Sequence, residues 1–311
     1  MATISTSLPP DPVLERRQLI QLRASQRLAR RTMESRISTV VIVTCLLIAL
    51  VPLGSVVIAL VTKGAHFLSW KFFTTLPQLP SLMSLNEIGG VGNAIAASLV
   101  IDTLAALVAV PVGIVVGLYL SSHETAPAKV VRSVVEMMTG MPSILFGVFA
   151  YEYFVVSLKT YSGMAAVIAL SMLMVPVIAK AAELAFRAVP ASLREAALAL
   201  GARESRVARQ VVMPTARPGV ITGVLLALAR AVGETAPVLL VVGPTISNLW
   251  NWNPLHPMTP MPLLIFGYSN SQFPSQRAAA WGVALTLVAL VVILTTTSRL
   301  ISNRMRKERH S

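Results

Sequence analysis

An arginine and a glutamate interrupt a long apolar stretch near the middle of the chain. Arg230 and Glu234 lie within residues 225–243, where nearly every other side chain is apolar. The two residues are four apart, so a helix over this stretch would place both on one face. A charged side chain at the centre of a membrane helix costs about 2.5–3.5 kcal/mol on insertion scales, so it is expected to face away from lipid. A guanidinium matches the oxygens of a tetrahedral oxyanion. The pair therefore indicates either an anion-binding site or an internal ion pair that fixes helix packing.

A proline follows this pair closely and is expected to disturb the helix that carries it. Pro237 has no amide hydrogen, so the carbonyl of Gly233 would lose its helical partner. We therefore predict a loosened turn next to Glu234, in the middle of the apolar stretch.

The composition places the chain in a membrane. Of its 311 residues, 55% are hydrophobic and only 13% are charged, about half the charged share of a soluble domain. Six apolar stretches are long enough to predict membrane helices. A single cysteine, Cys45, excludes an internal disulfide and a Cys-rich metal site, and the four scattered histidines have no ligand spacing, so no metal is expected. The predicted spans are 37–61, 91–120, 141–158, 163–185, 219–243 and 278–300.

The net charge of +13 is distributed unevenly between these spans. Most basic residues lie in a tail over residues 1–36, a tail over 301–311, and the segments after the second and fourth spans. The segments on the other side contain only Lys63, Lys71, Lys159 and Arg277. The positive-inside rule then predicts that both termini are cytoplasmic, which agrees with an even number of spans. The positive charge is thus explained by membrane topology, and nucleic acid is not an expected partner.

The segment over residues 186–218, between the fourth and fifth spans, is too structured to be a simple connection. Ser192 and Glu195 have the spacing of a capping box, which predicts that a helix begins there. Gly201 suits the position just after a helix end. A second short helix is expected from about Glu204, ending before Pro214. Two short helices joined at a glycine predict a docking element on the cytoplasmic side, in preference to a hairpin that merely covers helix ends.

This segment resembles the EAA loop of bacterial ABC importer permeases, which carries the coupling helix that docks in a groove of the cytoplasmic ATPase. The family pattern sets fixed distances between Glu-Ala-Ala, a glycine and a terminal proline. One departure is Ser205, where many members have a large aromatic residue. The resemblance implies a coupling role for Ser192, Glu195, Ala196, Ala197, Gly201 and Pro214.

The chain further resembles the permeases of phosphate-specific ABC importers, of the PstA family. Residues 230–237 read Arg-Ala-Val-Gly-Glu-Thr-Ala-Pro, like the signature of that family, and 140–147 read Gly-Met-Pro-Ser-Ile-Leu-Phe-Gly. Stretches 111–120 and 261–268 agree with it as well. The resemblance implies an all-α integral membrane protein with six transmembrane helices of the type I ABC importer permease fold, over residues 37–300. It also implies that Arg230 and Glu234 line the phosphate path.

The resemblance also assigns a basic residue and a set of partners. Lys180 follows Val-Pro in the fourth span, where the family has a basic residue; a lysine at the membrane edge paired with Glu183 is the alternative. The implied partners are a homologous PstC-like permease, a dimer of PstB-like ATPase subunits that bind the ATP, and an extracytoplasmic PstS-like phosphate-binding protein. The chain itself is expected to hold no cofactor and to lie in the bacterial inner membrane.

Two other functions remain as alternatives. The chain has no G-x-x-x-x-G-K-[ST] motif, so it is not expected to be an ATPase or an enzyme by itself. A permease for another oxyanion, such as sulfate or molybdate, would share the fold but not residues 233–237. A self-contained ion-coupled transporter could use Asp102 and Glu234 as proton carriers, but it would have no need of the EAA loop.

Overall fold

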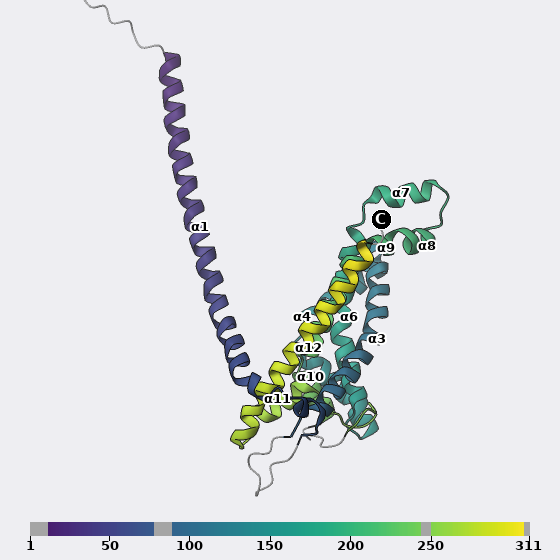
Figure 1. The fold of residues 1–311 in the computed structure, drawn as a ribbon. Coiled ribbons are helices and arrows are strands. Elements are labelled where there is room, and N and C mark those ends of the chain that lie inside the picture. Colours follow the sequence, from purple (N-terminus) through teal and green to yellow (C-terminus); the bar gives the residue numbers. More distant parts are fainter. Residues whose placement is uncertain (1–11, 78–88, 244–249, 308–311) are drawn as a thin grey trace, which may run out of the picture. The chain divides into compact units, whose positions relative to one another are not determined.

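A computed structural model describes residues 12–77, 89–243 and 250–307, with only the backbone at the outer ends of the first and last helices (Figure 1). The regular secondary structure of these residues is helical, apart from one isolated β-bridge between Pro77 and Gly89. Two of the elements, η2 and η3, are π-helical. In chain order the elements are α1 (Pro12–Gly64), η1 (Ala65–Phe67), α2 (Trp70–Thr74), α3 (Gly92–Ser122), α4 (Ala126–Gly140), α5 (Ile144–Ala150), η2 (Tyr151–Val156), α6 (Gly163–Arg187), α7 (Ala191–Ala199), α8 (Glu204–Val207), η3 (Ala208–Val212), α9 (Met213–Val232), α10 (Ala236–Val242), α11 (Met261–Ser269) and α12 (Pro274–Lys307).

The chain divides into two compact units, residues Met1–Ala59 and Leu60–Ser311. The described part of the first unit is most of helix α1, whose apolar side chains from Ile37 to Ile58 are largely exposed. The helix runs through residue 36 without a break, and residues 1–11 and 308–311 of the predicted tails lie outside the described residues. The second unit, called the bundle unit below, contains every other helix and both predicted sites.

The described helices confirm most of the predicted spans. Five are long and apolar enough to cross a membrane, or six if the bent pair of α4 and α5 with η2 is counted as one. The stretches Ser35–Phe67, Gly92–Ser122, Gly163–Arg187 and Pro274–Thr297 coincide with the predicted first, second, fourth and sixth spans. The third and fifth predicted spans differ, because the third begins at a bend between α4 and α5 and the fifth contains a break between α9 and α10.

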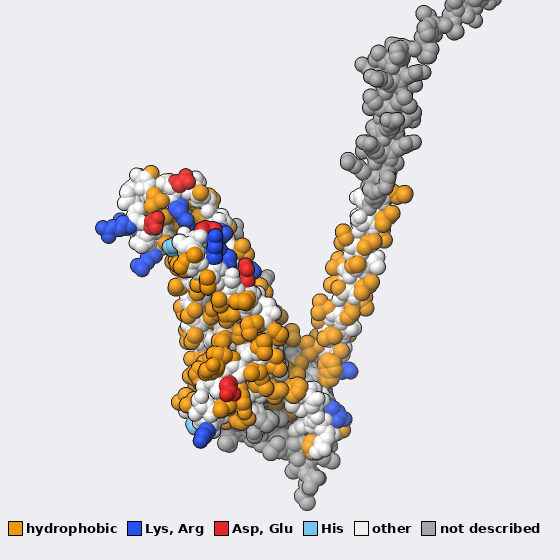
Figure 2. All heavy atoms as spheres, turned by 180° about the vertical axis from the view of Figure 1, so that it is seen from behind, with side chains coloured by type: hydrophobic (Ala, Val, Ile, Leu, Met, Phe, Trp, Pro, Cys, Tyr) orange, Lys and Arg blue, Asp and Glu red, His pale blue; other side chains and the backbone are white. Residues whose placement is uncertain are grey.

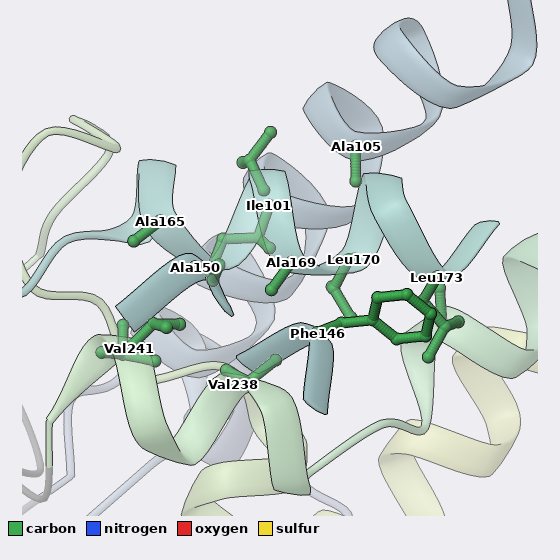
Figure 3. Packing of buried hydrophobic residues seen from close by; sticks show 14 of the residues in the cluster. Ile101, Ala105, Phe146, Ala150, Ala165, Ala169, Leu170, Leu173, Val238 and Val241 are labelled. Atoms are coloured by element: carbon green, nitrogen blue, oxygen red, sulfur yellow. The ribbon is translucent and has the colours of Figure 1, made fainter. Parts of the chain in front are cut away.

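Helix α6 is the central helix of the bundle unit. In the most apolar part of α6, 61% of the residues are buried. The corresponding shares are 22% for α3 and 28% for the span that includes α9. Phe146 and Ala150 of α5 lie between α6 and α10, where Val238 and Val241 close the cluster (Figure 3). A helix that is apolar on nearly all sides is buried by its neighbours. The position of α6 therefore fixes both the α5–α10 contact and the start of the segment that follows it.

Glycines allow α3 and α9 to approach α6 closely from two directions. A Cβ added at Gly117 of α3 would lie 2.6 Å from Cβ of Ala182 and 2.7 Å from the carbonyl oxygen of Ala179. A Cβ added at Gly223 of α9 would collide with Cβ of Ala181. Small residues of this kind drive helix association in membranes, where the hydrophobic effect between helices is absent. The backbones of three helices are thus packed against one another at the level of Ala179–Ala182.

We expect Gly117→Ala to loosen this packing. Overpacking a close contact typically costs about 1–3 kcal/mol, so the purified chain should unfold at a lower temperature than the wild type. Gly54→Ala is the matched control, because a Cβ at Gly54 meets nothing within 4 Å and both changes gain the same helix propensity. Thermal unfolding in detergent measures the difference, and equal midpoints for the two variants would contradict the close contact at Gly117.

Charged side chains gather at one end of the bundle unit, around α7 and α8, whereas hydrophobic side chains cover its middle (Figure 2). This is the end at which α6 leaves the apolar region and α9 enters it. The basic residues of the predicted cytoplasmic segment therefore lie together in space.

Candidate functional site

The fifth predicted span is two helices separated by a short turn. Helix α9 ends at Val232, and α10 begins at Ala236, with Thr235 as its N-cap residue. The amides of Gly233 and Glu234 bond to the carbonyls of Arg230 and Ala231 at 3.2 and 3.0 Å. The loosened turn predicted from Pro237 is thus a complete break. Pro237 lies in the first turn of α10, where the missing amide hydrogen has no helical partner to lose.

Arg230 and Glu234 form the predicted ion pair across the end of α9. Nε of Arg230 lies 3.3 Å from Oε1 of Glu234. The arginine side chain is 46% exposed, and the glutamate side chain is 16% exposed. The helices of this chain alone therefore leave a large part of the Arg230 side chain uncovered. Its guanidinium lies on the surface of the chain, where it can contact another subunit, water or a passing anion.

The second signature stretch, residues 140–147, packs directly against this break. A Cβ added at Gly147 would lie 2.5 Å from Cα of Pro237 and 2.7 Å from its carbonyl oxygen. The predicted span over 141–158 corresponds to the helix α5–η2, which is long enough to cross a membrane only together with α4, and α4 is bent by 108° from it between Gly140 and Ile144. Irregular backbone at membrane depth is tolerated only where protein or a water-filled cavity surrounds it. Residues 140–147 and 230–237 are far apart in the sequence, but the backbone after the bend at 141–143 packs against the backbone after the break at 233–235.

The other two membrane candidates lie apart from this pair. Lys180 is exposed on α6 and makes no ion pair with Glu183 within the described part of the chain. Asp102 of α3 lines a cavity of about 240 Å³ between α3, α9 and α12, whose other lining residues are uncharged. No basic residue among those the structure describes pairs with Asp102. Neither side chain therefore belongs to the Arg230–Glu234 pair.

Glu183 instead joins two arginines at the end of α6, which the sequence pattern did not indicate. Its Oε1 lies 3.0 Å from Nη2 of Arg132 on α4 and 3.1 Å from Nη2 of Arg187 on α6. Both arginines also donate to the carbonyl oxygen of Leu120, in the last turn of α3. Three helices are thus tied together immediately before the segment that contains α7. Lys180 and Glu183 suggested a local pair, whereas Arg132 is 51 residues away from Glu183.

We expect Glu183→Gln to destabilise this end of the bundle unit. Removing one partner of a buried pair costs several kcal/mol, and the partial exposure of Arg187 reduces the expected cost to about 1–3 kcal/mol. Glu124→Gln is the matched control, because Glu124 also pairs with Arg187 but is 74% exposed, so its loss should cost less than about 1 kcal/mol. Urea or thermal unfolding of the purified chain compares them. A loss at Glu124 as large as that at Glu183 would contradict the importance of the buried carboxylate.

The segment after α6 begins with helix α7, which presents apolar side chains to the outside. No residue of α7 is buried, and Leu193 and Leu198 are 45% and 39% exposed. The predicted capping box is wrong, since the N-cap is Pro190, two residues before Ser192, and no side chain caps the helix. Ser192 therefore lies within the first turn. Exposed leucines on a short surface helix are typical of a docking element.

Gly201 ends α7 in the way that the sequence predicted. Its φ of +79° is in the left-handed region, which glycine adopts without strain. The amide of Gly201 bonds to the carbonyl of Leu198 at 2.9 Å, and that of Ala202 bonds to the carbonyl of Ala197 at 3.2 Å. This pair of bonds is a Schellman motif. Gly201 therefore sets the angle at which α7 turns back toward α8.

The helix after Gly201 does not stop before Pro214, contrary to the prediction. Helix α8 continues through the π-helical segment η3 into α9, and Pro214 lies in the first turn of α9. A π-helical turn changes the hydrogen-bond register, so the chain can pass a proline without ending the helix. Of the predicted coupling residues, Ala197 packs partly against the cluster around Phe186, whereas Glu195 and Ala196 are exposed.

Comparisons with known proteins identify the family to which the chain belongs. Residues 109–307 match the family described as "Binding-protein-dependent transport system inner membrane component". The chain is 34% identical to the phosphate transport system permease protein PstA of Yersinia pestis, over 88% of this chain and 91% of that protein. It is 36% identical to the PstA permease of Mycobacterium leprae, over 84% of this chain and 86% of the relative.

Among solved structures, an inward-facing form of the MetNI methionine ABC transporter matches 70% of this chain and 94% of its own chain, with a TM-score of 0.51 and 22% identity. This likeness shows the fold of an ABC importer permease. The family match covers more than half of the chain and includes α6, α7 and α9. The chain therefore belongs to the binding-protein-dependent transport system inner membrane components, in the group of the PstA phosphate permeases.

Proposed function

We propose that the chain is the membrane-spanning permease subunit of an ATP-driven phosphate importer in the bacterial inner membrane. The observation that carries the proposal is the Arg230–Glu234 pair at the break between α9 and α10, held by the contact of Gly147 with Pro237. The two signature stretches of the phosphate permeases thus form one structural unit. The identity with PstA permeases over most of the chain supports phosphate as the transported anion.

Arg230 is proposed to bind phosphate during its passage. Its guanidinium is on the surface of the chain, and its fork of donors suits phosphate oxygens. Glu234 orients the guanidinium and offsets its charge when no phosphate is bound. An exposed arginine at membrane depth is unfavourable against lipid, so we propose that a second, PstC-like permease covers this face and completes the path. Lys180, also exposed, is a secondary candidate for the path.

The loop from α6 to α9 is proposed to couple the chain to a dimer of PstB-like ATPase subunits. The apolar surface of α7 supports this role, with Ser192, Glu195, Ala196, Ala197, Gly201 and Pro214 as the residues that shape the loop. The chain has no ATP-binding motif, so ATP is bound by the partner. We further propose six spans of the type I fold with cytoplasmic termini, in which α4, α5 and η2 form the bent third span. An extracytoplasmic PstS-like protein would deliver phosphate to the opposite side.

Affinity purification of the tagged chain from membranes tests the proposed assembly. The chain should purify with a second permease and an ATPase of the PstB type, and ATP hydrolysis by the preparation should rise when phosphate-loaded binding protein is added. Purification of the chain with an ATPase that responds to a different binding protein would overturn the assignment to phosphate. Growth of a strain without the chain at limiting phosphate gives an independent readout.

A further inference from the structure

A cavity of about 420 Å³ lies at the base of the loop, away from the Arg230–Glu234 pair and on the side of α9 where the helix begins. Helices α3, α6 and α9 and the π-helical segment η3 all contribute to its wall. None of the lining residues is acidic. They are Ile114, Phe186, Arg209, Met213, Pro214, Arg217, Val220 and Ile221.

Two arginines and an apolar wall give this cavity a mixed character. Arg209 and Arg217 are both exposed, so their guanidinium groups can reach a ligand at the mouth. Phe186 and Val220 are buried and belong to the apolar cluster beneath the loop. Guanidinium groups bind phosphate oxygens through paired hydrogen bonds. The apolar wall offers no hydrogen bonds, so it would not contribute to the binding of a free inorganic ion. The combination suits a phosphate group that carries an apolar chain.

The π-helical segment explains why both arginines line one cavity. Arg209 lies within η3, and Arg217 lies in the first part of α9. A π-helical turn contains more residues than an α-helical turn, so it rotates the preceding side chains relative to a regular helix. This register change allows residues eight apart to share a wall of the cavity.

The proposed orientation puts the cavity at the cytoplasmic leaflet. Charged side chains gather at this end on the face of the bundle unit that Figure 2 shows, and the segment between α6 and α9 is rich in arginine. Anionic lipids of the cytoplasmic leaflet are attracted to such basic segments, and basic pockets between membrane helices bind their headgroups. An acyl chain would extend from the cavity along the apolar surface of the helices.

We propose that this cavity binds an anionic phospholipid, with its phosphate group held by Arg209 and Arg217 and its glycerol end against Phe186 and Val220. The inference rests on the proposed membrane orientation but not on phosphate transport. A lipid bound here would join the start of α9 to the end of α6, the two ends of the segment that contains α7. The coupling loop would then be held in place by the membrane as well as by the protein.

Native mass spectrometry of the purified complex tests this proposal. The complex is titrated with phosphatidylglycerol or with phosphatidylcholine of the same acyl chains, and the bound lipids are counted. We expect Arg209→Gln combined with Arg217→Gln to weaken one phosphatidylglycerol site at least fivefold and to leave phosphatidylcholine binding unchanged. The matched control combines Arg203→Gln and Arg206→Gln, which removes two exposed arginines of the same loop outside the cavity, and it should bind like the wild type.

A second variant separates a lipid from free phosphate. Ile221→Phe adds volume to the apolar wall and leaves both arginines in place, so it should weaken phosphatidylglycerol binding without changing the binding of inorganic phosphate. It also provides the test if the double arginine variant fails to assemble. Unchanged phosphatidylglycerol binding in the cavity variants would overturn the proposal. Displacement of the lipid by millimolar inorganic phosphate would overturn it too, because the cavity would then be an anion site. Neither outcome depends on transport, so the proposed function is judged separately.

Discussion

Replacing Arg230 by glutamine should reduce ATP-driven phosphate uptake to the level of liposomes that lack the complex. The change keeps a polar side chain of similar length but removes the charge and the planar fork that match phosphate oxygens. Arg230 is exposed and its known partner in the chain is Glu234, so the change leaves the packing of α9 intact. The complex should therefore assemble, and part of its ATPase activity should survive. Uptake of radioactive phosphate into proteoliposomes measures the effect.

Two further variants define the role of Arg230. Arg230→Lys should recover only part of the uptake, since an ammonium lacks the two parallel donors of a guanidinium. Arg277→Gln is the control for loss of an exposed arginine, because Arg277 bonds only to the carbonyls of Ser271 and Gln272 among the described contacts. Normal uptake by Arg230→Gln with an intact complex would mean that the Arg230–Glu234 pair is structural. Lys180 would then be the next residue to test.

Replacing Gly201 by valine should abolish the ATP hydrolysis that the binding protein stimulates, while membrane insertion remains normal. A left-handed conformation costs an ordinary residue about 1–2 kcal/mol, and a β-branched residue is a genuine outlier there. The Schellman bonds that close α7 should therefore be lost. A Cβ at Gly201 meets nothing within 4 Å, so the effect can be ascribed to the backbone and not to a clash.

Gly201→Asn is the matched control for this change. Asparagine adopts the left-handed region much more readily than valine, so it should keep most of the stimulated hydrolysis. Hydrolysis by the assembled complex is measured with and without phosphate-loaded binding protein. A valine variant that stays fully stimulated would contradict the coupling role proposed for the loop.

The sequence predicted those features that depend on local chemistry. Four of the spans were predicted from apolar stretches, because a helix that crosses the membrane needs apolar side chains along its whole length. The positive φ of Gly201 followed from its place at the end of a helical pattern. The Arg230–Glu234 pair followed from a spacing of four residues. Each of these features can be predicted from residues that are neighbours in the sequence.

The features that it did not predict depend on contacts between distant parts of the chain. The bend at 141–143 lies at the start of an apolar stretch and the break at 233–235 lies inside one, and Gly147, just after the bend, packs against Pro237, just after the break. Ser192 fitted a capping box, but the N-cap is Pro190, two residues earlier. Glu183 finds Arg132 on another helix, so the nearer Lys180 was the wrong partner.

Phosphate uptake by the reconstituted complex tests the central claim most directly. Proteoliposomes contain this chain, its partner permease and the ATPase, with binding protein outside and ATP inside, and the uptake of radioactive phosphate is followed with sulfate or molybdate as competitor. The proposed function predicts uptake that requires this chain, ATP and the binding protein together, and that excess sulfate and molybdate leave unchanged. Full-rate phosphate movement through the isolated chain without ATP, or preferential uptake of sulfate or molybdate by the complex, would contradict it.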